Sequence, residues 1–354
     1  MSLNPFPINF LMRVIMSNKT ASYRTVWFDD NLYMIDQNQL PFKFEVKKLT
    51  HHSHTAAAIR DMTVRGAPAI GATAAYGMAQ AFLHGKNLEQ ARHMLASTRP
   101  TARNLFYALE RVAESDRPLD EAHAIAEEEV NASKRIGEYG DKLIKDGANI
   151  MTHCNAGWLA CVDWGTAIAP IYRAHRNGKE LFVYVSETRP RLQGARLTAW
   201  ELHNEQVHHT IISDNASAHF MQQGDIDLII VGADRIAANG DTANKIGTLD
   251  KAIVAREFKV PFYIAAPLST VDVACENGKK IPIEERSQDE VLYAHGVGRA
   301  KQEKVRIASP GSTAKNPAFD VTPAKFIKGI ITEKGIVKPS EIGSFAKRQA
   351  KRSK

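Results

Sequence analysis

The chain has 354 residues, 44% of them hydrophobic and 24% charged, which is the composition of a globular protein with one large or two medium domains. No run of about 18 uncharged apolar residues occurs, so a membrane-spanning helix is not expected. Residues 346–354 supply five positive charges and no negative one. Subtracting these five from the net charge of +7 leaves +2, which gives no reason to expect a nucleic-acid partner.

The two ends and the cysteines bear on where the protein works. Residues 1–22 contain a mildly apolar piece, but Asn9 and Arg13 interrupt it and no basic residue precedes it, so a secretory signal fits poorly. We expect an N-terminal extension at residues 1–22 and a basic, solvated tail at residues 346–354. Three cysteines without close pairing favour free thiols and a cytoplasmic location.

The pattern from residue 23 to residue 143 is mostly helical. Residues 23–49 alternate irregularly and predict two or three short strands. Apolar residues at helical spacing then predict helices at residues 56–62, 72–82, 88–97, 101–115 and 118–143. In the fourth of these, Leu105, Tyr107 or Ala108, Leu109 and Val112 mark one apolar face. We therefore expect a small, mostly helical N-terminal domain at residues 23–143.

After Gly147 the pattern changes to short apolar runs separated by helical segments. The runs are residues 149–153, 181–186, 209–213, 226–231 and 261–265. Such alternation predicts parallel βαβ units, and near-continuous apolar strands suit a sheet covered on both faces. The expected fold is therefore α/β, with a parallel-sheet domain at residues 144–345.

Polar or reactive residues directly follow most of these runs. They include Cys154-Asn155, Glu187-Thr188-Arg189, Asp214-Asn215 and Asp234-Arg235. The carboxyl ends of parallel strands face one common crevice, where ligands bind. We therefore expect the functional site at this edge of the sheet.

Cys154 is the first candidate for chemistry, because it ends a strand and a helix is expected to follow. Helix amides and the positive end of the helix dipole lower the pKa of a thiol and favour the thiolate. A buried structural cysteine is the commoner case. The neighbours His153 and Asn155, at the expected ligand edge, favour a functional reading, whereas the other two cysteines have no such context and are interpreted as structural.

Asp234 is the second candidate, at the end of the apolar run 226–231. A partly desolvated carboxylate has a raised pKa and can act as both acid and base. The alternative is an aspartate that caps the next turn or pairs with Arg235. With Cys154 at the same sheet edge, we favour catalysis.

Lys245 and Asn244 form a candidate anion site. They precede a helix expected at residues 249–258, and a lysine beside free helix amides binds phosphate well. The alternative is a solvated lysine at an ordinary helix start. No complete Walker pattern is present, so this motif does not identify a phosphate site by itself.

A second candidate anion site is the segment Arg65-Gly66-Ala67. Glycine allows close backbone approach, and arginine can bind a phosphate through two N–H groups. The alternative is a tight loop that packs small residues between helices. Arg99, before an expected helix, and Gln193, after an expected strand, could bind hydroxyl groups or phosphate, although each alone is more typical of a surface.

The sequence gives no sign of a metal or a dinucleotide cofactor. No ligand pair has helical or Cys-x-x-Cys spacing, and no Gly-x-Gly-x-x-Gly follows an expected strand. The histidines at positions 51, 52 and 54 are more typical of an exposed turn than of a metal site. We expect neither a metal nor a cofactor.

Several long motifs together resemble the S-methyl-5-thioribose-1-phosphate isomerases. They are residues 65–71, 99–102, 152–157, 187–190, 193–202, 232–247 and 316–323, and the resemblance runs from residue 23 to residue 342. Two departures are Val185-Ser186, where the family usually has Ala-Asp, and residues 309–315. The wider superfamily includes ribose-1,5-bisphosphate isomerases and regulatory subunits of translation initiation factor 2B.

The resemblance implies a mostly helical N-terminal domain beside a Rossmann-like C-terminal domain, in a homodimer without cofactor or metal. It implies that Asp234 is the general acid/base and Cys154 its partner. The implied substrate ligands are Arg65, Gly66, Ala67, Arg99, Gln193, Asn244 and Lys245. The implied activity is the isomerisation of 5-methylthioribose 1-phosphate to 5-methylthioribulose 1-phosphate in methionine salvage, with a sugar phosphate as the small-molecule partner.

This reaction needs ring opening by proton donation, because the anomeric oxygen carries the phosphate. We expect apolar surroundings to keep Asp234 protonated at rest. Cys154 would take the C2 proton, giving a phosphoenolate, or stabilise charge during a hydride shift, and both routes stay open. Two other functions are an isomerase of ribose 1,5-bisphosphate or 5-deoxyribose 1-phosphate, and a non-catalytic regulatory subunit. The latter need not keep Cys154 and Asp234 together.

Overall fold

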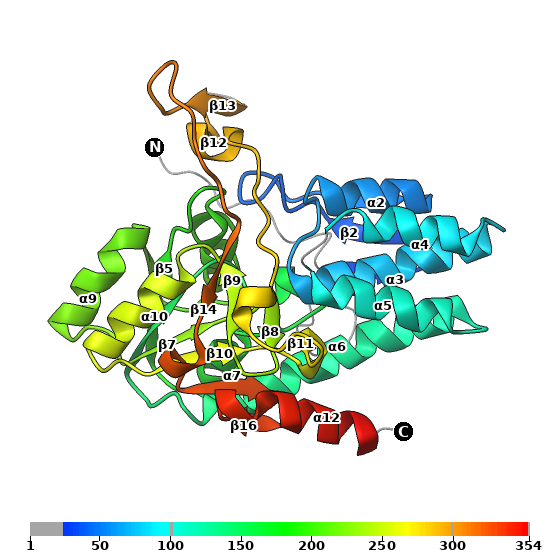
Figure 1. The fold of residues 1–354 in the computed structure, drawn as a ribbon. Helices are drawn as coiled ribbons and strands as arrows, with labels where there is room; N and C mark the ends of the chain where they lie inside the picture. Colours follow the sequence, from blue (N-terminus) through cyan, green and yellow to red (C-terminus); the bar gives the residue numbers. More distant parts are fainter. Residues whose placement is uncertain (1–23, 100–101, 299–300, 353–354) are drawn as a thin grey trace.

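The structure is a computed structural model that describes residues 24–99, 102–298 and 301–352. A helical part and a part built on a large sheet lie side by side (Figure 1). This arrangement confirms the expected α/β fold class. The extension expected at residues 1–22 and the last two residues of the expected tail lie outside the described residues.

The helical part contains a small antiparallel sheet followed by helices. Its strands are β1 (Val26–Phe28), β2 (Leu32–Ile35) and β3 (Val46–Leu49), and its helices are α2 (His52–Arg60), α3 (Ala67–Leu83), α4 (Leu88–Ala96), α5 (Arg103–Ala113) and α6 (Pro118–Asp141). These elements confirm the strands and helices expected there. Helix α3 is central, because every residue from Ala67 to Ala81 is buried, as suits a helix that is apolar all round. On α5, Ala108 rather than Tyr107 lies on the buried face.

The second part contains a large sheet with the strand order β16-β15-β10-β7-β4-β5-β6. The strands are β4 (Ala148–Thr152), β5 (Leu181–Ser186), β6 (His209–Ile212), β7 (Leu228–Val231), β10 (Phe262–Ala265), β15 (Gly329–Thr332) and β16 (Gly335–Val337). All neighbouring strands are parallel except β15 and β16. Numbered along the chain, the parallel strands run 3-2-1-4-5-6, the order of a doubly wound sheet, which reverses between β4 and β7.

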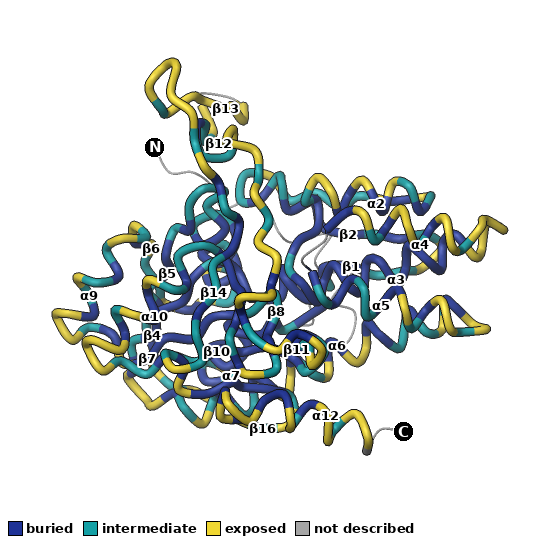
Figure 2. Tube along the Cα trace, in the orientation of Figure 1, coloured by how far each residue is buried: buried dark blue, intermediate teal, exposed yellow. Residues whose placement is uncertain are grey.

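Helices cover both faces of this sheet. Ile150 packs on one face with α6, α7 (Ala169–Arg176) and α8 (Ala199–Asn204). The next residue, Met151, packs on the other face with α9 (Ser217–Gln223), α10 (Thr248–Glu257) and α12 (Ile342–Arg352). Because successive side chains point to opposite faces, strands covered on both sides are apolar throughout. Figure 2 shows the resulting buried interior.

Helix α6 joins the two parts, because it packs against both α3 and α7. Gly140 allows the close contact with α7, since a Cβ there would lie 2.3 Å from Cγ of Pro170. The domain boundary expected between residues 143 and 144 falls between α6 and β4. The boundary expected between residues 345 and 346 falls inside α12, where Ile342 and Ala346 are buried.

A smaller sheet with the order β11-β8-β9-β14 was not expected from the sequence. Its strands are β8 (Arg235–Ala237), β9 (Thr242–Lys245), β11 (Val271–Asp272) and β14 (Phe319–Thr322). Polar residues such as Arg235, Asn244 and Asp320 interrupt these short strands, so none of them forms an apolar run that the sequence could reveal. Strands β8 and β9 follow β7 along the chain, so the smaller sheet lies next to the edge where we expect the site.

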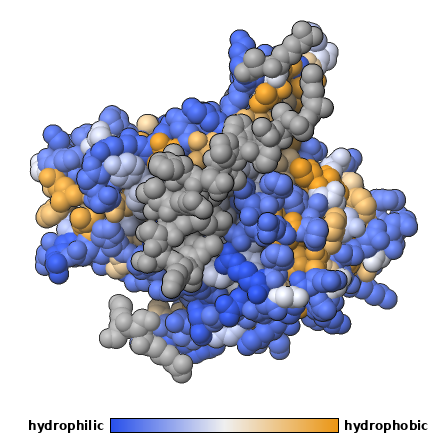
Figure 3. All heavy atoms as spheres, turned by 180° about the vertical axis from the view of Figure 1, so that it is seen from behind, coloured by the Kyte–Doolittle hydropathy of each residue, from blue (hydrophilic) through white to orange (hydrophobic). Residues whose placement is uncertain are grey.

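A hairpin of β12 (Tyr293–Val297) and β13 (Gln302–Arg306) projects from the sheet part (Figure 1). Val297, Val305 and Ile307 on or beside it are exposed, and Figure 3 shows hydrophobic side chains there from behind. The remaining short helices and turns are α11 (Asp289–Leu292), η1 (Trp158–Ala160), η2 (Gly194–Thr198), η3 (Asp214–Ala216), η4 (Leu268–Thr270), η5 (Gly278–Lys280), η6 (Ala324–Phe326) and η7 (Pro339–Glu341). No helix in the described part of the chain has the length and apolar character needed to span a membrane.

Candidate active site

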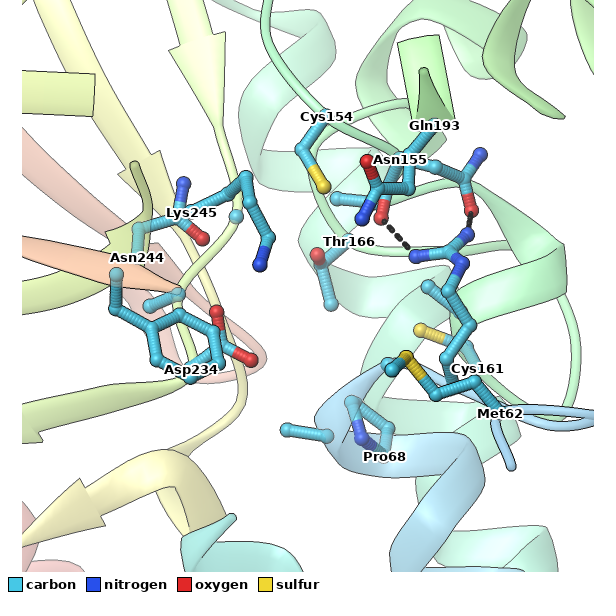
Figure 4. Close-up of a pocket in the computed structure, with 18 of the residues that line it drawn as sticks. Met62, Pro68, Cys154, Asn155, Cys161, Thr166, Gln193, Asp234, Asn244 and Lys245 are labelled. Carbon is cyan, nitrogen blue, oxygen red and sulfur yellow. Dashed lines mark hydrogen bonds between the residues drawn. The ribbon is translucent and has the colours of Figure 1, made fainter. Parts of the chain in front are cut away.

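A cavity lies beyond the carboxyl ends of β4 and β7, where the strand order reverses. All nine residues that the sequence analysis selected line it: Arg65, Gly66, Ala67, Arg99, Cys154, Gln193, Asp234, Asn244 and Lys245. Arg65 to Ala67 and Arg99 come from the helical part, and the others come from the sheet part. The site therefore lies at the junction of the two parts (Figure 4).

Cys154 is held in an unusual backbone conformation directly after β4. Its φ of 66° lies in the left-handed region, which disfavours non-glycine residues by roughly 1–2 kcal/mol. Two side chains hold it there: Cys154 N–H donates to Thr188 Oγ1 (2.8 Å), and Thr198 Oγ1 donates to the Cys154 carbonyl (2.7 Å). The sulfur points into the cavity (Figure 4).

The expectation that a helix start activates this thiol is wrong. A loop with the short 3₁₀ turn η1 follows Cys154, and the next α-helix, α7, begins only at Ala169. Burial raises the pKa of the Cys154 thiol, while the positive charges of Arg65 and Lys245 act in the opposite direction. The thiolate is therefore favoured by two nearby cations and not by a helix dipole.

His153, whose presence favoured a functional reading of Cys154, does not line the cavity. Its Nε2 donates to the Ile246 carbonyl at 2.8 Å, and the side chain is buried. Burial holds the pKa of this imidazole well below its usual value, so it stays neutral. Asn155, the other neighbour, does line the cavity and binds Arg65.

Asp234 directs its carboxyl group into the cavity (Figure 4). Its backbone N–H donates to the Ala243 carbonyl at 2.9 Å, so the pairing of the smaller sheet holds it in place. Burial raises the pKa of Asp234, while Lys245 and then Arg99 lower it. The alternative that Asp234 pairs with Arg235 does not hold, because Arg235 Nε lies 3.4 Å from Asp272 Oδ2.

Lys245 ends strand β9 and is almost fully buried. Its Nζ donates to the Ala318 carbonyl at 2.8 Å and lies 4.4 Å from the centre of the Phe319 ring. Burial lowers the pKa of Lys245 to about 8, with the charge of Arg286 acting in the same direction. Its neighbour Asn244 donates from Nδ2 to Thr248 Oγ1 at 3.0 Å.

The amides that follow Lys245 are not free, which corrects the sequence-based expectation. Gly247 N–H and Leu249 N–H donate to the Asp320 carboxylate at 2.7 and 3.1 Å, so Asp320 caps the start of α10. Burial raises the pKa of Asp320 to about 6. Lys245 therefore contributes a charge to the cavity, and α10 does not contribute its N-terminus.

The N-terminus of α3 meets the cavity instead. Gly66 precedes this helix with φ of 92°, and a Cβ there would lie 2.4 Å from the Ala160 carbonyl oxygen. Only glycine fits, so the backbone of Gly66 and Ala67 lines the cavity directly. No side chain of the described residues caps α3, so the positive end of its dipole faces the cavity.

Arg65, Arg99 and Gln193 bring buried polar atoms to the cavity. Arg65 donates to the backbone carbonyl of Asn155 at 3.2 Å and to its side-chain Oδ1. Within the described part of the chain, Arg65 Nε, Arg99 Nε and Nη1, and Gln193 Oε1 have no hydrogen-bond partner. Buried groups of this kind cost free energy unless a ligand bonds to them. An anionic ligand with hydroxyl groups would satisfy all of them.

Gln193 is held by a local irregularity of the chain. It immediately precedes η2, a single turn of π-helix, a feature that is frequent at functional sites. The next residue, Gly194, approaches the backbone so closely that a Cβ there would lie 1.7 Å from the Ser186 carbonyl oxygen. Any side chain at position 194 would therefore displace Gln193.

Arg286 is a cavity residue that the sequence analysis missed. Its backbone N–H donates to the Asn316 carbonyl at 2.9 Å, which places the side chain beside Phe319. Its Nε donates to Glu284 Oε1 at 3.0 Å. The segment around it has neither periodicity nor a glycine-rich motif, so no local signal pointed to it. Met62, Pro68, Thr166 and Phe319 also line the cavity and were not selected.

The described lining contains four basic side chains, Arg65, Arg99, Lys245 and Arg286, and one acidic side chain, Asp234. In a buried cavity such a surplus of cations favours an anionic ligand. In the residues that the structure describes, no three His, Cys, Asp or Glu side chains lie close enough together to hold a metal ion.

The doubly wound sheet, with a thiol, an acid and four cations at its reversal point, defines an α/β protein suited to binding a small anionic molecule. Residues 63–339 match the model of the Initiation factor 2 subunit family. The chain belongs to this family, among its methylthioribose-1-phosphate isomerase members.

Individual relatives agree with this placement. The methylthioribose-1-phosphate isomerase of Methylorubrum extorquens is 51% identical, with 91% of this chain and 95% of the relative covered. The crystal structure of 5-methylthioribose 1-phosphate isomerase from Pyrococcus horikoshii OT3 is 45% identical with a TM-score of 0.80, covering 92% of this chain and 96% of that one. The translation initiation factor eIF-2B subunit delta from A. fulgidus is 39% identical with a TM-score of 0.77, covering 92% and 100%.

Proposed function

We propose that this protein is an aldose–ketose isomerase that converts 5-methylthioribose 1-phosphate into 5-methylthioribulose 1-phosphate in methionine salvage. The observation that carries the proposal is that Asp234 and Cys154 share one buried cavity whose other charged side chains are all cations. The names of the similar proteins support the same activity. A protein that only binds partners has no need of an acid and a thiol in such a cavity.

The substrate's phosphate group binds at the N-terminus of α3. Arg65 and Arg99 supply buried N–H groups that have no hydrogen-bond partner among the described residues, although Arg99 Nε lies 3.8 Å from Glu284 Oε2. The helix end adds backbone amides and a favourable dipole. Gln193 and Asn244 lie within reach of the sugar hydroxyls in the same cavity, and Lys245 adds charge. Binding several oxygens at once holds the sugar ring in one orientation beside Asp234 and Cys154.

Asp234 acts as the general acid and then as the general base. Protonated Asp234 donates its proton to the ring oxygen while the bond between C1 and that oxygen breaks. The hydrogen on C2 then moves to C1, and the Asp234 carboxylate accepts the proton of the C2 hydroxyl as the ketone forms. The acid is thereby regenerated, and no redox partner is needed.

Cys154 acts at C2. In one route its thiolate removes the C2 proton to give a phosphoenolate, which is then protonated at C1. In the other route the hydrogen moves from C2 to C1 as hydride, and Cys154 stabilises the charge that develops. Deuterium placed at C2 tests the routes: complete washout into water rules out hydride transfer, whereas retention at C1 is the result that hydride transfer requires.

The test of the activity is a turnover assay of the purified protein with three substrates: 5-methylthioribose 1-phosphate, ribose 1,5-bisphosphate and 5-deoxyribose 1-phosphate. We expect the first to have the highest kcat/KM. Arg286 is a further cation that a second phosphate could use, but Glu284 already neutralises it at 3.0 Å. Apolar atoms of Met62, Pro68 and Phe319 suit a methylthio group better. Absence of turnover with all three would overturn the proposal.

The assembly, location and domain limits belong to the same proposal. We propose a homodimer in the cytoplasm, with domains at residues 23–143 and 144–345. The resemblance to the isomerase family supports the dimer, and three free cysteines support a reducing compartment. Analytical ultracentrifugation measures the assembly directly, and a monomer at micromolar concentration would contradict a stable dimer.

A further inference from the structure

Glu201 in α8 is a buried carboxylate that the proposed chemistry does not use. It is fully buried and lies beneath residues 154–159, which we call the cysteine loop. Its Oε1 accepts from Asn155 Nδ2 (2.6 Å) and Leu159 N–H (3.3 Å). Its Oε2 accepts from Trp158 N–H (2.8 Å) and the Tyr172 hydroxyl (2.7 Å). One side chain thus holds three residues of the loop that carries Cys154.

The cysteine loop is shaped around this carboxylate. A Cβ at Gly157 would lie 1.9 Å from Glu201 Oε2, so the loop backbone packs directly on the carboxyl group. All four partners are donors, which matches the ionised form of Glu201. Burial raises the pKa of Glu201 to about 7, and the bonds from Tyr172, Asn155 and Trp158 N–H oppose that rise. A buried charge that accepts four hydrogen bonds holds its partners firmly.

Asn155 connects Glu201 to the cavity. While its Nδ2 donates to Glu201, its Oδ1 and its backbone carbonyl both accept from Arg65 (Figure 4). Asn155 Nδ2 also donates to Thr198 Oγ1 at 3.1 Å, which fixes the orientation of the amide. Arg65 belongs to the helical part, so the chain of contacts crosses the junction at which the cavity lies.

We propose that Glu201 is a positioning residue of this site, which holds Asn155 and through it the guanidinium group of Arg65 beside Cys154. The inference deepens the proposed function, and its kinetic readout rests on that function. Arg65 faces the substrate's phosphate and is also the strongest opposing influence on the raised pKa of the Cys154 thiol. Displacing Arg65 would therefore weaken both substrate binding and the thiolate.

The variant Glu201→Gln tests the inference, because an amide must place an N–H against at least one of the donors. We expect kcat/KM to fall by about 10²-fold, as misplaced binding groups cause. We also expect alkylation of Cys154 by iodoacetamide, followed by mass spectrometry over a range of pH, to report a thiol pKa about one unit higher, which slows alkylation about 10-fold at a given pH.

The direction in which the pKa of Cys154 shifts distinguishes a positioning role of Glu201 from the mere loss of its negative charge. Deleting the negative charge of Glu201 would by itself favour the thiolate and lower the pKa of Cys154. Displacement of the Arg65 guanidinium group from the sulfur would instead raise the pKa of Cys154. Lys245 and Asp234 also act on this thiol and stay unchanged in the variant. An unchanged or lowered pKa of Cys154 in folded Glu201→Gln protein would overturn the inference.

Tyr172→Phe is the matched control. It removes another donor from the same carboxylate, on the oxygen that does not contact Asn155. We expect its thiol pKa and kcat/KM to stay close to those of the unmodified protein, even where stability falls. If Tyr172→Phe changed the thiol pKa and kcat/KM as much as Glu201→Gln does, Glu201 would only stabilise the fold, and the inference would be contradicted. Should Glu201→Gln not fold, Glu201→Asp keeps the charge, shortens the reach to Asn155 and serves the same test.

A double-mutant cycle with Asn155→Ala tests whether Glu201 acts through Asn155. If Glu201 acts through Asn155, the double variant has the same kcat/KM as Asn155→Ala alone, and the effects are not additive. Additive effects would contradict that route. Alkylation of Cys154 needs no turnover, so it tests the role of Glu201 even if the protein lacks isomerase activity. Failure of this inference can therefore be distinguished from failure of the proposed function.

Discussion

At the scale of single residues, burial and nearby charges shift the pKa values of the site residues in opposite directions. Burial raises the pKa values of Asp234 and Cys154 and lowers that of Lys245, and in each case neighbouring groups of opposite charge act against the shift. The pKa of the acid therefore moves up toward neutral pH and that of the amine moves down to about 8, while nearby cations limit the rise at the thiol, and this suits proton transfer.

Asp234→Asn and Cys154→Ala test the two reacting groups. Each removes one acid–base or charge-stabilising group, so we expect kcat to fall by about 10²–10⁴-fold, with circular dichroism and thermal unfolding showing a folded protein. Gln206→Ala, at an exposed position outside the cavity lining, is the control for effects of making and purifying a variant. Near-normal turnover in either site variant would contradict the role of that residue.

Lys245→Ala tests the buried cation. Loss of a charge-assisted contact with the phosphate, worth about 1.5–3 kcal/mol, should raise KM by about 10- to 100-fold and change kcat less. Lys245 has a pKa of about 8, so it is charged below that pH and loses its charge above it. We therefore expect kcat/KM of the unmodified protein to decline above pH 8, and the part of the decline due to Lys245 to be absent in the variant. An unchanged KM would argue against a phosphate contact.

At the scale of elements, two helix N-termini approach the site and have different roles. Helix α10 is capped by Asp320, so its first amides are used within the protein. Helix α3 begins at a glycine with positive φ and has no side-chain cap among the described residues. A helix end without a protein cap, directed at a cavity rich in cations, is suited to phosphate.

Gly66→Ala tests the start of α3. Its Cβ would lie 2.4 Å from the Ala160 carbonyl, so the helix end must shift and substrate binding should weaken, with KM raised about 10-fold or more. Gly85→Ala is a matched control, since Gly85 also has positive φ but no atom within 4 Å of the added Cβ. We expect Gly85→Ala to lose about 1 kcal/mol of stability and keep its KM. Equal KM values for the two variants would contradict the assignment.

At the scale of the whole molecule, a second buried carboxylate lies between the two parts. Glu129 of α6 accepts from Ser269 Oγ at 3.1 Å, and Ser269 Oγ accepts from Asn104 Nδ2 of α5 at 3.0 Å. Ser269 follows β10, so this network connects the helices to the large sheet. Burial raises the pKa of Glu129 to about 7, with the bond from Ser269 acting against the rise.

Glu129→Gln tests how this carboxyl group links stability to pH. The pKa is 4.5 in the unfolded chain and about 7 in the folded one, so the folded state binds the proton more tightly. The stabilisation is complete below pH 4.5 and is lost as pH rises through about 7. Urea unfolding should therefore show the variant gaining stability relative to the unmodified protein, by up to about 3 kcal/mol, as pH is raised across this range. A difference that does not depend on pH would contradict the raised pKa.

Much of the local structure could be predicted from the sequence. The strands β4 and β5 and the helices α3 to α6 follow from apolar periodicity, which depends only on nearby residues. Residues such as Cys154 and Asp234 could be selected because they lie just past the ends of such strands. The strands of the smaller sheet could not be predicted, because polar residues interrupt them and leave no apolar run.

The sequence by itself determined the α/β alternation and the nine cavity residues, since motif and periodicity are local properties of the chain. Only the tertiary structure decided how these residues are held. Asp320 caps α10 from 73 positions away, Glu201 binds Asn155 across 46, and Arg65 reaches Asn155 across 90. Arg286 joins the cavity through backbone pairing with residue 316. Contacts at such separations depend on packing of the whole chain, so no local pattern contains them.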